Sequence, residues 1–172
     1  MFHVGDLIIY SAHGVCQIDD ICEKTFAGIT RNYYTVHPLE GNHLSISIPV
    51  NQETEAILKI LSREEAEAIV ESFQRPGIAW IEKNNTRVQT YHNIINTSQR
   101  QDIADIVNTL MKKKLDVELH DKKFNNSDHK LLAPVQKILF QELAIALDTT
   151  YEDVLERVNK SIQLGSKAVP RQ

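Results

Sequence analysis

The stretch MFHVGDLIIY, residues 1–10, decides the fold of the first part of this 172-residue chain. It contains a Gly5-Asp6 turn signal and a hydrophobic run that ends in Tyr10, and His13-Gly14 follows as a second turn signal. Short apolar runs between such turn residues are typical of strands that pair with their neighbours. The stretch therefore predicts the beginning of a small β-barrel.

The rest of the first fifty residues also has the features of strands. Residues 43–48 (HLSISI) place an apolar side chain at every second position, which is the period of a half-buried strand. Residues 31–36 (RNYYTV) are rich in residues that favour strands, and Ala27-Gly28 is a further turn signal. Short strands joined by tight turns fit a five-stranded barrel of the Tudor or SH3-like type, and Pro49 would close its last strand.

From residue 51 onward the hydrophobic period becomes that of helices. Ser62-Arg63-Glu64-Glu65 and Ser98-Gln99-Arg100-Gln101 are capping boxes, and apolar residues follow each of them at spacings of three and four. Asn126 or Ser127 is expected to cap a third strong helix, and Thr150 to open a fourth. A weaker pattern predicts another helix over about 83–95.

Two segments of the second part are less regular. Pro134 lies inside the third helical pattern, which predicts a kink or a break into two pieces. Residues 115–126 are expected to form a loop. The sequence as a whole predicts an α+β chain with a Tudor- or SH3-like barrel at 1–52, an all-helical domain at 53–163 and a disordered tail at 164–172.

The net charge of −4 is unevenly distributed. Residues 1–58 carry two basic side chains, Lys24 and Arg31, against seven acidic ones, whereas residues 75–114 carry seven basic side chains against three acidic ones. Phosphates would be repelled by the acidic front half, and only the middle of the chain is suited to contact nucleic acid. The run of lysines at 112–114 also fits a solvated helix end.

Several classes of function find no support in the sequence. No apolar run approaches the roughly 20 residues that cross a membrane, and no signal-peptide pattern stands at the start, so a cytoplasmic location is expected. Cys16 and Cys22 fall in one expected strand and should stay reduced. The seven histidines lack metal-ligand spacing, and no phosphate loop or nucleophile elbow is present. We therefore expect no metal, no cofactor and no enzymatic activity.

Short motifs over about residues 1–160 have a characteristic order and spacing. The front half contributes Val4-Gly5-Asp6, Ile9-Tyr10, His13-Gly14 and Ile48-Pro49. The back half contributes residues 102–110 (DIADIVNTL), 130–132 (KLL), 136–139 (QKIL) and 142–144 (ELA). In this order the motifs resemble the CarD family of bacterial transcription regulators, whose first module also occurs as the polymerase-binding part of the transcription-repair coupling factor.

The resemblance implies two macromolecular partners and no small-molecule substrate. An edge strand of the barrel would pair with the β-subunit lobe of RNA polymerase, with contacts from Lys24, His43, Ser45, Ile46, Ser47 and Ile48. The helical part would touch promoter DNA at the upstream edge of the melted bubble, where a Trp of this family wedges into the minor groove. The residues expected at the DNA are Trp80, Lys83, Asn84, Arg87, Lys112, Lys113, Lys114 and Lys130.

The chain departs from the family pattern at several positions. Ser11 stands where the family often has Pro, and Ser47 where it often has a basic residue. His129 also stands where the family usually has a basic residue, and position 134 is a Pro where the family usually has none. Alignment on Arg87 puts Asn84 at the position of the family's Trp. Trp80 lies one helical turn earlier, where it could replace the wedge or belong to the core.

Two functions are compatible with these features. The first is a regulator that binds the polymerase β subunit and stabilises promoter open complexes. The basic cluster at 75–114 favours this regulator. The alternative is a polymerase- or protein-interaction module without direct DNA binding, which the acidic front half and Asn84 favour.

Overall fold

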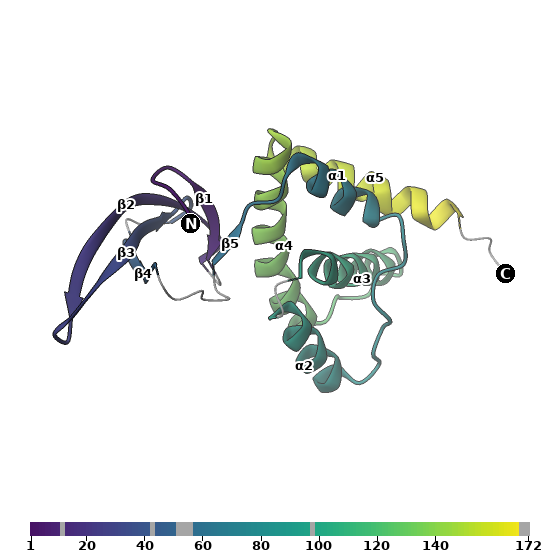
Figure 1. Cartoon of the computed structure of the whole chain (residues 1–172). Coiled ribbons are helices and arrows are strands. Elements are labelled where there is room, and N and C mark those ends of the chain that lie inside the picture. Colours follow the sequence, from purple (N-terminus) through teal and green to yellow (C-terminus); the bar gives the residue numbers. More distant parts are fainter. Residues whose placement is uncertain (11–12, 42–43, 51–56, 97–98, 169–172) are drawn as a thin grey trace. The chain divides into compact units, whose positions relative to one another are not determined.

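The computed structural model describes residues 1–10, 13–41, 44–50, 57–96 and 99–168. The chain divides into two compact units, Met1–Ile60 and Leu61–Gln172. Within the described ranges, the strands belong to the first unit and the α-helices to the second (Figure 1). The boundary between the two units therefore follows Ile60, whereas the sequence had suggested a boundary after residue 52.

The first unit is a five-stranded antiparallel sheet with the strand order β4-β3-β2-β1-β5 (Figure 1). Its strands are β1 (Leu7–Tyr10), β2 (Val15–Phe26), β3 (Ile29–Pro38), β4 (Ile46–Pro49) and β5 (Ile57–Lys59). This arrangement confirms the predicted fold class. The fifth strand corrects the expectation that the helical part begins near residue 51, because a strand of three residues is too short to show a period of two.

One face of the sheet forms the core of the first unit. The buried side chains on this face are Ile8, Cys16, Ile18, Tyr34, Val36 and Ile48. Both cysteines lie in one strand, β2, as expected, and burial raises the pKa of the Cys16 thiol. Ala27 and Gly28, with φ angles of 50° and 78°, form the predicted turn between β2 and β3.

The second unit consists of five helices: α1 (Arg63–Ser72), α2 (Asn84–Ile95), α3 (Arg100–Leu119), α4 (Asn126–Leu147) and α5 (Tyr151–Ala168). The capping box at Ser62 is present, since Ser62 Oγ accepts from the Glu65 N–H and Glu65 Oε2 accepts from the Ser62 N–H. Thr150 Oγ1 accepts from the Asp153 N–H and so caps α5, as predicted. The expected helix at 83–95 corresponds to α2.

Two helix boundaries differ from the expectation. Helix α3 has Gln99 as its N-cap, and Ser98 lies outside the described residues. At its other end α3 continues through residues 115–119, which had been expected to be loop. In this last part apolar residues alternate with acidic ones (LDVEL), so the sequence lacks the helical period there, and Leu115 and Leu119 are exposed.

Helix α4 also corrects the sequence-based expectations. Its N-cap is Asn125, whose side chain accepts from the Ser127 N–H, and not Asn126 or Ser127. The helix is continuous through Pro134, so the expected break into two pieces is wrong, and the kink stays a prediction. Both Pro134 and Lys130 are exposed, and water can therefore satisfy the Lys130 carbonyl that receives no hydrogen bond from the proline.

Helix α5 extends to Ala168, so the predicted disordered tail is wrong for residues 164–168, and residues 169–172 lie outside the described range. The helix is held there by close packing at Gly165. A Cβ atom at this position would overlap with the carbonyl group of Gln74 after α1. None of the described helices is long and apolar enough to cross a membrane.

We expect Gly165→Ala to lower the free energy of unfolding by about 1–3 kcal/mol, the usual cost of overpacking. Gly to Ala within a helix ordinarily stabilises it by about 0.5–1 kcal/mol, so the expected sign is reversed by the contact with Gln74. Urea denaturation of the full chain measures the effect. Lys167→Ala, at an exposed position two residues further along α5, is the control. A neutral or stabilising Gly165→Ala would show that α5 does not pack closely there.

Candidate functional site

Strand β4 is an edge of the sheet, and its backbone N–H and C=O groups point alternately toward β3 and away from it. The Val50 N–H donates to the Asn32 carbonyl at 2.9 Å, and the same register pairs Ile48 with Tyr34 and Ile46 with Val36. In an antiparallel pair, facing residues alternate between those that exchange hydrogen bonds and those that do not. Ile46 and Ile48 therefore direct their backbone groups to β3, whereas Ser47 directs its N–H and C=O to the free edge.

Pro49 fits this alternation. It occupies the next outward-facing position after Ser47, where its missing N–H breaks no hydrogen bond within the sheet. The outward groups of β4 are thus one N–H donor, from Ser47, and the carbonyls of Ser47 and Pro49. This edge is suited to accept a further strand from a partner.

The predicted polymerase contacts divide into accessible and inaccessible groups. Lys24 Nζ donates to Ser47 Oγ at 2.7 Å and to Thr35 Oγ1 at 3.0 Å, so the structure brings Lys24 and Ser47 together. Ser45 is exposed, whereas Ile48 is only 2% exposed and belongs to the core. Its inclusion among the contact residues is therefore corrected. His43 lies outside the described residues.

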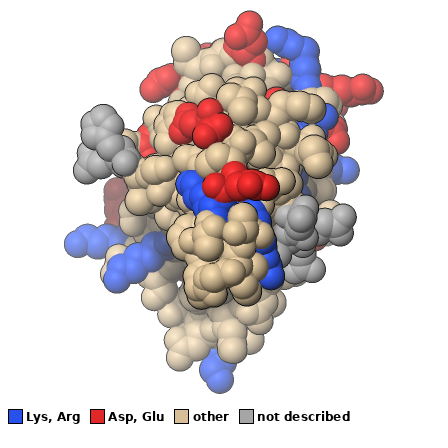
Figure 2. All heavy atoms as spheres, turned by 60° about the vertical axis from the view of Figure 1, so that its left-hand side comes forward, with Lys and Arg blue, Asp and Glu red and all other residues tan. Residues whose placement is uncertain are grey.

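Basic residues are few in the first unit, where residues 1–60 contain Lys24, Arg31 and Lys59. In Figure 2, Lys and Arg side chains are interspersed with Asp and Glu side chains over the face in view, and most of that face is uncharged. An interface through β4 would consequently depend on backbone hydrogen bonds more than on a basic surface.

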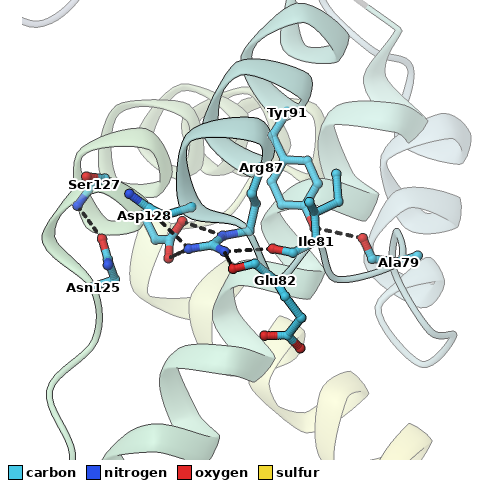
Figure 3. A network of polar contacts seen from close by, with 9 residues as sticks. Ala79, Ile81, Glu82, Arg87, Tyr91, Asn125, Ser127 and Asp128 are labelled. Carbon is cyan, nitrogen blue, oxygen red and sulfur yellow. Dashed lines mark hydrogen bonds and ion pairs between the residues drawn. The ribbon is translucent and has the colours of Figure 1, made fainter.

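In the second unit, Arg87 lies at the centre of a buried polar network (Figure 3). Its Nε and Nη2 atoms donate to the two carboxylate oxygens of Asp128 at 2.9 and 2.7 Å. Nη1 donates to the carbonyls of Ile81 and Glu82 at 2.7 and 3.1 Å, and Nη2 also donates to Asn84 Oδ1 at 2.9 Å. All five N–H donors of the guanidinium group are therefore used within the chain.

This network corrects the role predicted for Arg87. The residue is 3% exposed and Asp128 is 1% exposed, and no donor of Arg87 remains for a phosphate. Asn84, predicted as a DNA contact, is half-buried and accepts from Arg87. The two residues therefore hold the start of α2 in place.

Trp80 is neither fully buried nor free. It packs partly against the helical core, the Arg87 guanidinium carbon lies 4.0 Å from its ring centroid, and Lys113 Nζ lies 5.1 Å from it. Both distances are in the range of cation–π contacts. The same indole lines an open groove of the second unit together with Gly77, Thr109, Lys112 and Lys113.

The segment that carries Trp80 has no regular structure and is fixed by side chains from two helices. Thr109 Oγ1 donates to the Ile78 carbonyl at 2.7 Å, and the Tyr91 hydroxyl donates to the Ala79 carbonyl at 2.8 Å. Burial raises the pKa of Tyr91, which keeps this donor protonated. A Cβ atom at Gly77 would overlap with Thr109, so only glycine fits this close approach to α3.

The predicted lysines differ in their relation to the groove. Lys112 Nζ donates to the Arg75 carbonyl at 2.7 Å, and burial lowers the pKa of this lysine. Glu82 and Asp116 also line the groove, so its charge is mixed. The structure thus brings together Trp80, Lys112 and Lys113. Among the described residues, the groove is not lined by the other three predicted lysines, Lys83, Lys114 and Lys130.

Sequence reasoning missed Asp128. In the sequence it resembles an ordinary acidic residue of a first helical turn, where it would only complement the helix dipole. Its partner Arg87 is 41 residues away, and no local signal connects the two. Among the described residues, no group of three His, Cys, Asp or Glu side chains is placed to hold a metal ion.

Comparisons with known proteins cover both units. The family described as "CarD-like/TRCF RID domain" matches residues 2–61, and "CarD, C-terminal domain" matches residues 57–159. The chain is 25% identical over 155 residues to a Bacillus subtilis (strain 168) protein named "Putative transcription factor YdeB", with 90% of this chain and 97% of that protein covered. The chain therefore belongs to the CarD family of transcription factors and has a transcription-related role that involves interaction with RNA polymerase.

Proposed function

We propose that this chain binds the β subunit of RNA polymerase through the free edge of β4 and stabilises promoter open complexes through DNA contacts at the upstream edge of the bubble. The observation that carries the proposal is the register of β4, which turns the Ser47 N–H and C=O away from β3 at an edge of the described sheet, in a unit that matches the polymerase-interacting module of the family. The groove beside Trp80 provides the second contact.

Strand addition explains how the first unit can bind without a basic residue at position 47. When a partner strand is added to an edge, main-chain hydrogen bonds provide much of the affinity and side chains adjust the specificity. The Ser47 hydroxyl is occupied by Lys24, which places an ammonium group beside the edge. A carboxylate on the partner strand would be complementary to it.

The groove of the second unit has the components of a contact with unpaired DNA. The indole of Trp80 can stack on a base, and Lys113 at the same groove can pair with a phosphate. Stacking of a base on an aromatic ring contributes about 1–3 kcal/mol. If this contact forms only with melted DNA, it shifts the closed–open equilibrium by roughly 5–150-fold.

The interaction module without DNA binding remains the alternative proposal. Residues 61–172 carry sixteen basic and sixteen acidic side chains, so this unit has no net charge. Nonspecific attraction to phosphates would be weak. A pull-down against RNA polymerase followed by footprinting of a promoter separates the two proposals, since only the first extends protection to the upstream edge of the bubble. Absence of binding to polymerase would contradict the first proposal and would leave, of the alternative, only a module that binds another protein.

We expect Trp80→Ala to shorten the lifetime of open complexes by roughly 5–150-fold, the equivalent of the lost stacking. Truncation of a core Trp instead lowers stability by about 3–5 kcal/mol, so a melting curve of the same variant distinguishes the two roles. The control is Leu164→Ala, at an exposed apolar position of α5. A large drop in melting temperature with an unchanged lifetime would assign Trp80 to the core.

A further inference from the structure

We propose that Arg87 and Asp128 are positioning residues, which hold the Trp80 indole in the orientation that binds DNA. The inference rests on the proposed function of the groove. It assigns to the buried ion pair a role that acts through the neighbouring ring, in place of a direct contact with phosphate. Three features of the second unit carry it.

The first feature is the rigidity of the guanidinium group. Its five donors are bound by acceptors from two places: the segment 81–84, which leads into α2, and Asp128 in the first turn of α4. Because the acceptors surround the planar group, it can neither rotate nor translate without losing a hydrogen bond. The guanidinium group of Arg87 is therefore held rigidly between the start of α2 and the start of α4.

The second feature is the contact of this guanidinium group with the Trp80 indole. The guanidinium carbon is 4.0 Å from the Trp80 ring centroid, within the range for a cation over an aromatic face. Arginine is suited to this position because its planar group can stack on a ring while its edge makes hydrogen bonds. A lysine would keep the charge and lose both the plane and the fork of donors.

The third feature is the irregular backbone of Trp80 itself. Residues 79 and 80 belong to no helix or strand, so no regular backbone hydrogen bonds fix the direction of the indole. The Ala79 carbonyl is held by Tyr91, and Arg87 holds the next carbonyls at Ile81 and Glu82. The same arginine thus restrains the backbone after Trp80 and one side of its ring.

A second buried ion pair in the same unit serves as the matched control. Arg100 donates to Glu142 at 3.0 and 3.2 Å, and the Glu142 side chain also accepts from the Leu61 N–H. This pair has the same chemistry and a similarly buried carboxylate, whereas the cations placed over the Trp80 ring are those of Arg87 and Lys113. It reports the effect of disturbing a buried pair without disturbing the indole.

The test uses Trp80 fluorescence, because this is the single Trp of the chain. Arg87→Lys and Arg100→Lys are compared in the full-length protein, since both keep the charges of their pairs. We expect Arg87→Lys to increase acrylamide quenching of Trp80 and to weaken binding to promoter DNA with an unpaired upstream fork about tenfold, equivalent to about 1.4 kcal/mol. Arg100→Lys should leave both the quenching and the affinity unchanged.

Asp128→Asn and Glu142→Gln repeat the comparison from the carboxylate side, with the same expected contrast. Equal changes in the two members of either comparison, or unchanged quenching in Arg87→Lys, would overturn the positioning role. Trp80→Ala in the same binding assay separates this outcome from a failure of the proposed function. If it leaves the affinity unchanged, the groove does not bind DNA, and the quenching data still decide whether Arg87 holds the ring.

Discussion

Ser47→Pro is expected to abolish binding to RNA polymerase while the five-stranded sheet remains folded. The register of β4 on β3 directs the Ser47 N–H to the free edge, so its loss removes the donor offered to a partner strand and none of the hydrogen bonds within the sheet. Pro49 already occupies the equivalent outward position two residues later. Capture of polymerase by the full-length variant measures binding, and circular dichroism with a melting curve verifies the fold.

Two variants control this experiment. Ser47→Ala keeps the backbone donor and loses only the hydroxyl that accepts from Lys24, so polymerase binding should persist. Ile48→Pro removes a donor that faces β3 and should unfold the sheet, which verifies the assigned register. If folded Ser47→Pro binds polymerase as well as the unchanged chain, the edge of β4 is not the interface. Loss of binding in Ser47→Ala would assign the contact to the Lys24–Ser47 pair.

Arg87→Ala should lower the free energy of unfolding of the helical unit by about 3–5 kcal/mol, because it leaves the Asp128 carboxylate buried without its partner. The carbonyls of Ile81 and Glu82 lose their donor in the same change. Urea denaturation followed by far-ultraviolet circular dichroism detects the helical transition, which can be separate from that of the sheet.

Lys83→Ala is the control for this prediction. Lys83 is exposed and precedes the same helix, so its truncation should change stability by no more than about 0.5 kcal/mol. The two roles considered for Arg87 give opposite results. A phosphate contact would leave the stability of Arg87→Ala unchanged and reduce the salt dependence of DNA binding. That result would contradict the buried network and the positioning role together.

Local patterns in the sequence were sufficient for the architecture. The change from period two to period 3.6 predicts a strand-rich unit followed by a helical one, because these periods follow from the backbone geometry of single elements. The capping box at Ser62 and the turn at Ala27-Gly28 also depend on neighbouring residues only, and the structure contains both. Where a segment is short, as in β5, or lacks a buried face, as in the end of α3, the pattern is absent and the prediction was wrong.

Tertiary structure alone decided the candidate sites. Whether β4 is an edge depends on the order of all five strands, and the direction of the Ser47 N–H depends on the register with β3. In the sequence Arg87 is one of several basic residues, whereas in the structure it forms an ion pair with Asp128, 41 positions away. The position of Trp80, between the helical core and the groove, likewise depends on residues distant in the sequence. Hydrogen-bond partners and burial are properties of distant segments brought together, and the period of a sequence carries no information about them.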